Sequence, residues 1–254
     1  MGVHQSGVAA DRAAASTGGL TMSAARKTAA ARGAQRLIRS LCLWLLSSLV
    51  CSTALARHHG TTAADGGVPG QFDYYLLSLS WSPAYCLTHS QDRRQCGDRG
   101  LGFVLHGLWP QYDSGRYPQN CVEATPLDQQ AAALGQTLYP SPRLMQHEWE
   151  SHGTCSGLDA VAYFRTADRA LAAVQLPAMF EAPRQSLELS SAQIVAAFRT
   201  SNPALPDDGI TIACSHGQLS EVRLCLTREL SPRACGRRVR SNCPEVPILV
   251  RSSR

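Results

Sequence analysis

Lysine is almost absent from this sequence of 254 residues: Lys27 is the only one, so nearly all of the 24 basic residues are arginines. Residues 1–56 hold six of the basic residues and one of the 19 acidic ones, which leaves 18 of each sign after residue 56. The basic excess of the whole chain therefore belongs to its N-terminal part, and the remainder is formally neutral. A broad basic surface for nucleic acids is not indicated, and contact with RNA or DNA would need local groups of arginine and histidine.

A long apolar run is also lacking. The run at 41–50 has ten residues, whereas a helix that spans a bilayer needs roughly 20. Arginines precede this run and Ala-Leu-Ala follows it at 54–56, so residues 1–56 are predicted to be a secretory signal peptide. An uncleaved membrane anchor and a start of translation at Met22 remain alternatives. The predicted signal peptide places the mature protein in a periplasm or outside the cell, without stable membrane association.

Eight cysteines follow the predicted signal peptide, and no two of them form a C-x-x-C pair. That absence disfavours a structural zinc site. An even number of cysteines in an exported chain predicts four disulfides and an oxidising compartment. The spacing alone does not choose among the many possible pairings. The eight residues are Cys86, Cys96, Cys121, Cys155, Cys214, Cys225, Cys235 and Cys243.

Strand and helix patterns both occur after a polar, glycine-rich stretch at 57–70, which is expected to be a flexible linker. Residues 71–254 show no internal repeat and have the length of a single domain. Apolar patterns predict strands at 72–81, 101–106, 210–214, 218–227 and 246–250. Caps and spacing predict helices at 126–138, from Pro142 to a stop at Gly153, at 159–174, and from Ser190 or Ser191 to Asn202. Helices grouped between strands favour an α+β fold, in which helices pack on a central, mainly antiparallel sheet.

Two histidine clusters stand out, at 106–110 (HGLWP) and 147–155 (HEWESHGTC). The second lacks the spacing of the zinc motif H-E-x-x-H, because His147 and His152 are five residues apart, about 140° around a helix. Glu148 and His152 are instead the pair at i and i+4. A G-x-S-x-G elbow is absent, and paired cysteines offer no free thiol nucleophile. A metal-dependent hydrolase is therefore the weaker alternative.

The chemistry that these clusters favour uses histidines without a metal or a protein nucleophile. Two imidazoles with pKa values of about 6.5 serve as general base and general acid near neutral pH. The strand expected at 101–106 ends at His106 beside Gly107, which would place this imidazole at a sheet edge or cleft. Cleavage of RNA by its own 2′-hydroxyl needs such a pair, because one histidine removes the hydroxyl proton and the other protonates the leaving 5′-oxygen. A further cation or hydrogen-bond donor stabilises the developing charge.

The segments 106–110 and 147–155 resemble the two active-site segments of the ribonuclease T2 family, and residues 81–86 and 221–226 also resemble that family. The resemblance implies an endoribonuclease that cleaves single-stranded RNA through a 2′,3′-cyclic phosphate and uses no metal and no cofactor. We expect a monomer whose partner is its RNA substrate. By motif position, the implied roles are His152 as general base, His106 as general acid, His147 as phosphate ligand, Glu148 as electrostatic partner and Trp109 as a side chain that packs or stacks on a base.

The resemblance also implies four disulfides, namely Cys86 with Cys96, Cys121 with Cys155, Cys214 with Cys243, and Cys225 with Cys235. The chain departs from the family at Ser151, where a lysine is usual, and Arg116 or Arg143 are candidates for the missing cation. This departure motivates an alternative function, a secreted RNA-binding or interaction protein with weakened catalysis on the same fold. Glu221 is expected to be a polar residue at a strand edge rather than a part of the site.

Overall fold

The structure is a computed structural model that describes residues 66–181 and 183–253. The predicted signal peptide and most of the predicted linker lie outside the described residues. In the part of the chain that is described, no helix has the length and apolar character needed to cross a membrane.

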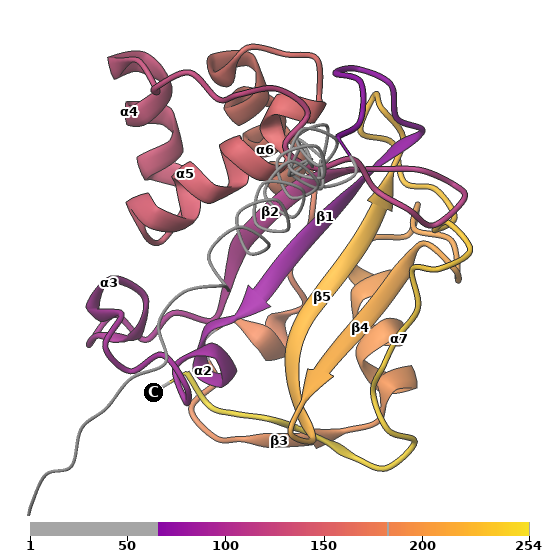
Figure 1. The fold of residues 1–254 in the computed structure, drawn as a ribbon. Coiled ribbons are helices and arrows are strands. Elements are labelled where there is room, and N and C mark those ends of the chain that lie inside the picture. Colours follow the sequence, from indigo (N-terminus) through magenta and orange to yellow (C-terminus); the bar gives the residue numbers. More distant parts are fainter. Residues whose placement is uncertain (1–65, 182, 254) are drawn as a thin grey trace, which may run out of the picture. The chain divides into compact units, whose positions relative to one another are not determined.

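A central sheet organises the described residues (Figure 1). Strand β1 (Tyr74–Trp81) pairs antiparallel with β2 (Phe103–Gln111) on one side and with β5 (Gln218–Leu226) on the other. Strand β4 (Ile210–Ser215) joins β5 through the turn formed by His216 and Gly217. The short strands β3 (Leu187–Leu189) and β6 (Ile248–Val250) pair with each other, and one parallel bridge connects β6 to β5. The prediction of a mainly antiparallel sheet in an α+β fold is confirmed.

Helices cover one face of the sheet, and a side chain caps the start of each of the longer ones. The four longer helices are α4 (Gln129–Leu138), α5 (Pro142–Ser151), α6 (Ala160–Ala172) and α7 (Ser191–Ser201), with caps at Asp128, Ser141, Asp159 and Ser190. In Figure 1, α5 and α6 lie beside β2, α4 lies beside α5 and α6, and α7 lies beside β4. Helix α4 begins after Asp128 rather than at Pro126, because the Asp128 side chain accepts a hydrogen bond from the Ala131 amide.

Several short elements complete the fold. They are α2 (Ser82–Tyr85), α3 (Arg93–Cys96), and the 3-10 turns η1 (Gly153–Cys155) and η2 (Ala178–Phe180). Helix α5 ends at Ser151 rather than continuing to Gly153, because His152 leaves the helical conformation with φ of −122°. The imidazole of His152 is therefore carried by the end of the helix and not by its regular face.

Strand β1 is buried on both faces, because an apolar cluster covers each of them. Tyr75, Leu77 and Trp81 face the main core with the helices, whereas Tyr74 and Leu76 belong to a smaller apolar cluster on the opposite face. The indole of Trp81 packs edge-on against Phe103 at 4.8 Å between ring centroids. This packing holds β1 and β2 rigidly together, so groups on these strands keep a fixed relation to the helices.

The expectation that a strand ends at His106 is wrong, because β2 continues to Gln111. Ser78 pairs with Gly107 and Leu79 pairs with Leu105, so His106 is an extra residue in β2 that has no partner on β1. Such a β-bulge bends the strand and changes the direction of the bulged side chain. The bulge, and not the end of a strand, is what brings the His106 imidazole to the surface, where it is 31% exposed.

All four expected disulfides are present: Cys86 with Cys96, Cys121 with Cys155, Cys214 with Cys243, and Cys225 with Cys235. The Cys121 pair joins the segment after β2 to η1, directly after His152. The amide of Asn120 donates to the Ser151 carbonyl at 3.0 Å in the same place. The end of α5 is thus fixed to the segment that follows β2.

Candidate active site

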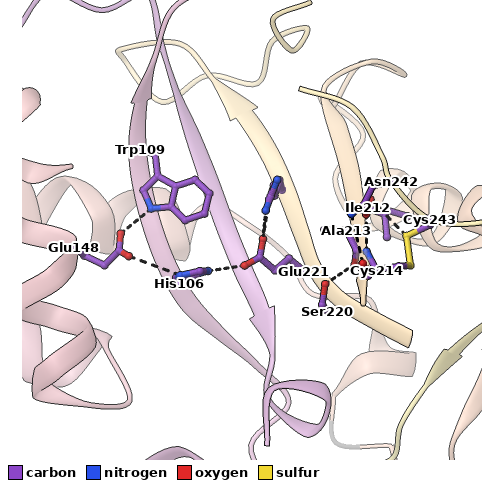
Figure 2. A network of polar contacts seen from close by, with 11 residues as sticks. His106, Trp109, Glu148, Ile212, Ala213, Cys214, Ser220, Glu221, Asn242 and Cys243 are labelled. Atoms are coloured by element: carbon purple, nitrogen blue, oxygen red, sulfur yellow. Dashed lines mark hydrogen bonds and ion pairs between the residues drawn. A yellow bond between two sulfur atoms is a disulfide. The ribbon is translucent and has the colours of Figure 1, made fainter. Parts of the chain in front are cut away.

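Three elements meet at the two histidine clusters. Strand β2 contributes His106 and Trp109, the end of α5 contributes Glu148 and His152, and β5 contributes Glu221. Figure 2 shows the chain of contacts that runs from Trp109 to Glu148, then to His106 and on to Glu221. Residues far apart in the sequence therefore form one polar network.

Glu148 is the buried centre of this network. Its Oε2 accepts a hydrogen bond of 2.7 Å from Trp109 Nε1, and its Oε1 lies 3.8 Å from His106 Nε2. Burial raises the pKa of Glu148 to about 7, against the charge of His106 and the Trp109 hydrogen bond, which lower it. Oε1 has no hydrogen-bond partner among the described residues. A carboxyl group with this pKa exchanges its proton near neutral pH, and its second oxygen, although buried, faces His106 without a hydrogen bond among the described residues.

His106 is held between two carboxyl groups. Its Nδ1 lies 2.6 Å from Glu221 Oε1, and since a carboxylate only accepts, Nδ1 carries the hydrogen of that bond. Burial acts to lower the pKa of His106, but the hydrogen bond and charge of Glu221, with the charge of Glu148, outweigh it, and the pKa is raised overall. The imidazole therefore stays protonated to higher pH than usual, and Nε2 is the nitrogen left to give a proton to a ligand.

His152 has the opposite environment. Only 7% of the residue is exposed, and its Nδ1 has no hydrogen-bond partner in the described part of the chain. Burial, followed by the positive charges of His147 and His106, lowers the pKa of His152 to about 3. The imidazole is therefore neutral in the free protein, with a lone pair whose basicity a bound anion would increase.

The indole of Trp109 lies close to both imidazoles. Its ring centroid lies 5.0 Å from that of His106 and 5.3 Å from that of His152. Two histidines whose environments shift their pKa values in opposite directions can serve as an acid and a base in one site. The geometry thus places a donor and an acceptor of protons next to the same indole.

His147 lies at the exposed side of α5, and Ser151 Oγ lies 3.4 Å from its Nδ1. One ligand atom each of His147, Glu148 and His152 lie within 4.8 Å of one another, so among the described residues they form a possible metal site. The sequence spacing did not indicate this cluster, because His152 leaves the helical conformation and turns towards the other two residues.

The expectation that Glu221 is a polar residue at a strand edge is wrong. Strand β5 has neighbours on both sides, and Glu221 contacts His106 across the sheet. Arg223, two residues further on the same face, donates to Glu221 Oε2 at 2.7 Å and lies over the Trp109 ring at 5.6 Å. Although burial acts to raise it, the His106 hydrogen bond and the Arg223 charge lower the pKa of Glu221 to about 2. The signal in the sequence was this pair of charges inside a predicted strand.

Known proteins resemble this chain in both sequence and fold. Residues 72–235 match the model of the Ribonuclease T2 family. A ribonuclease of Aeromonas hydrophila is 55% identical over 92 residues, which are 36% of this chain and 41% of that protein. A probable ribonuclease of Haemophilus influenzae is 37% identical over 121 residues, 41% of this chain and 44% of that protein. The chain therefore matches less than half of the length of these two relatives.

Other relatives are matched over most of their length. Ribonuclease DdI of Dictyostelium discoideum is 32% identical over 209 residues, which are 76% of this chain and 88% of that protein. The structure of RNase NT in complex with 5′-AMP matches with a TM-score of 0.53 and 27% identity, over 70% of this chain and 97% of that one. An RNase-related protein from Calystegia sepium matches with a TM-score of 0.58 and 23% identity, over 71% and 97% of the two chains, and shows the shared fold.

Proposed function

The chain belongs to the ribonuclease T2 family, and from that premise we propose that it is an exported endoribonuclease that cleaves single-stranded RNA through a 2′,3′-cyclic phosphate. The observation that carries this proposal is the pair of imidazoles of His106 and His152 that both lie next to Trp109, in surroundings that shift their pKa values in opposite directions. Four disulfides support an oxidising compartment, either a periplasm or the outside of the cell. We further propose that the enzyme acts as a monomer, without metal or cofactor.

In the proposed reaction, neutral His152 takes the proton of the 2′-hydroxyl as its oxygen bonds to phosphorus. The bond from phosphorus to the 5′-oxygen then breaks, and His106 gives its Nε2 proton to that oxygen. The cyclic phosphate and a free 5′-hydroxyl are the products. A bound phosphate would raise the pKa of both histidines, because negative charge favours the imidazolium form. Each proton transfer contributes about 10²- to 10⁴-fold to the rate.

The other residues bind and orient the substrate. His147 would contact the phosphate from the open side of α5, and Trp109 would pack on a nucleobase. Glu148 fixes the indole through Nε1 and turns its second oxygen towards His106 Nε2. Glu221 is a positioning residue, because its hydrogen bond to Nδ1 leaves Nε2 of His106 facing the reaction.

Product analysis on one defined RNA tests this function. We expect fragments that end in 2′,3′-cyclic phosphate, detected by mass spectrometry, and full activity in excess chelator. Activity that is lost with chelator and restored by Zn²⁺ would instead support a metal site at His147, Glu148 and His152. Absence of cleavage from acidic to neutral pH, with binding of RNA retained, would favour the alternative of an RNA-binding protein on this fold.

The pH profile tests the part played by Glu221. Because Glu221 raises the pKa of His106, the acid form of His106 is lost only as pH rises through the raised value. Glu221→Gln should therefore move the alkaline limb of kcat/KM to lower pH and leave the acidic limb, which follows His152, in place. Glu188→Gln, an exposed change on β3, is the matched control. An unmoved alkaline limb would remove Glu221 from the mechanism.

The missing lysine gives a separate prediction. Ser151 Oγ lies 3.4 Å from His147 Nδ1, the Arg223 guanidinium lies over the Trp109 ring at 5.6 Å, and Arg143 lines the same cavity as His147. Ser151→Lys should raise kcat, because a second cation near the phosphate stabilises the developing charge. The exposed change Glu150→Lys controls for a general increase in positive charge. If Ser151→Lys is no faster than the wild type, the serine does not limit turnover.

A further inference from the structure

Two stacked rings that the proposed mechanism does not use lie at the start of the loop closed by the Cys86 to Cys96 disulfide, one at the end of α2 and one in the loop. The rings of Tyr85 and His89 are parallel within 5°, and their centroids lie 4.1 Å apart. His89 Nδ1 lies 2.8 Å from Thr88 Oγ1 and 3.1 Å from the Tyr85 carbonyl oxygen, which holds the imidazole over the phenol ring. His89 is exposed, so the outer side of this stack is accessible to a further ring.

A cavity connects the catalytic centre to the stack. It has a volume of about 510 Å³ and is lined by His106 and by Tyr85, Thr88 and His89. A second cavity of about 900 Å³ shares the last three residues and continues past them to Arg143. The stack therefore lies where the two cavities meet, and an extended ligand that leaves the site beside His106 would pass over it.

Positive charge lines the second cavity. Arg94 and Arg143 both line it, and within residues 66–181 and 183–253 neither guanidinium has a hydrogen bond or an ion pair. Asp92 is the carboxylate of this lining, and both of its oxygens are engaged, one by the Gln95 amide and one by the Tyr85 hydroxyl. The two cations are therefore available to an anionic ligand.

We propose that the Tyr85 and His89 stack binds a nucleobase beyond the leaving nucleoside, in the RNA segment on the 3′ side of the cleaved bond, while Arg94 and Arg143 contact the phosphates of that segment. This inference rests on the proposed function, in which His106 protonates the leaving 5′-oxygen. The leaving nucleoside and the chain attached to it must therefore lie on the His106 side. Aromatic stacking and cationic contacts to phosphate recognise single-stranded RNA without regard to sequence.

Three substrates with the same scissile bond test the site: a dinucleoside monophosphate, the same unit with three nucleotides added on the 3′ side, and the unit with three added on the 5′ side. The measured quantity is the ratio of kcat/KM for each extended substrate to that of the dinucleoside. We expect about a tenfold ratio for the 3′ extension, as for one stacked base, and a smaller ratio for the 5′ extension. The ratio for the 3′ extension should fall as the salt concentration rises.

Variants then assign this ratio to the stack. His89→Ala leaves the disulfide and the half-buried Tyr85 in place, and it should reduce the 3′ ratio towards one. The double variant Arg94→Ala and Arg143→Ala should reduce the dependence of the 3′ ratio on salt concentration. His216→Ala is the matched control, because this exposed histidine also lines the first cavity but has no aromatic ring stacked on it among the described residues.

The outcomes are distinct. The inference is overturned if the 3′ ratio is large in the wild type and unchanged in His89→Ala. It is also overturned if the 3′ ratio falls only in His216→Ala. Either result leaves the proposed function intact. The same holds if only the 5′ extension raises kcat/KM. If the wild type cleaves none of the three substrates, the proposed function itself fails.

Discussion

Replacing either His106 or His152 with alanine should lower kcat for RNA cleavage by about 10²- to 10⁴-fold, the usual contribution of one acid or base. The two side chains have separate roles, since the pKa of one is raised and that of the other is lowered. Neither variant should unfold the protein, because His106 belongs to a bulge and His152 follows the last residue of α5. Single-turnover rates on a defined RNA measure the effect, and a wild-type rate in either variant would refute its role.

A substrate with a good leaving group separates the acid from the base. When a uridine 3′-phosphodiester carries a nitrophenolate in place of the 5′-oxygen, the leaving group needs no proton. His106→Ala should then be nearly as fast as the wild type, whereas His152→Ala should remain slow, because the 2′-hydroxyl still has to lose its proton. Equal losses on this substrate, or the reverse order, would show that the roles are assigned wrongly.

The second large effect is on stability, at the disulfide between Cys121 and Cys155. Replacing both with alanine should lower the free energy of unfolding by about 4 kcal/mol, because the bond closes a loop of 34 residues and restricts the unfolded chain. The measurement is unfolding in denaturant under non-reducing conditions.

Removal of the Cys86 to Cys96 bond, whose loop has only 10 residues, is the matched comparison. It should cost about 1 kcal/mol less, because the entropy of loop closure grows with the logarithm of loop length. Equal losses would mean that local packing, rather than loop closure, sets the stability. Activity should suffer more in the Cys121 and Cys155 variant, since that bond holds the backbone directly after His152.

Much of the fold could be predicted from the sequence, because its signals are local. A side chain such as Asp159 or Ser190 bonds the amide three residues ahead, so the start of a helix is visible in a few letters. Short pieces such as α2, α3 and β3 were not predicted, since three or four residues carry too little periodicity.

The candidate site could be predicted only where its residues share a motif. The contact between Glu221 and His106 joins positions 115 residues apart and depends on how β5, β1 and β2 align. The position of the Tyr85 and His89 stack next to the catalytic centre likewise depends on tertiary packing. No local pattern encodes either relation.

The bulge in β2 means that the pairing of β1 with β2 does not depend on His106. Nine residues of β2 lie opposite eight of β1, and His106 is the surplus one. A chain that lacked this single position would keep every pairing between the two strands and would form an uninterrupted ladder. The proposed acid is thus an insertion that the sheet tolerates but does not require. We expect the shortened chain to be at least as stable as the wild type and to lose RNA cleavage.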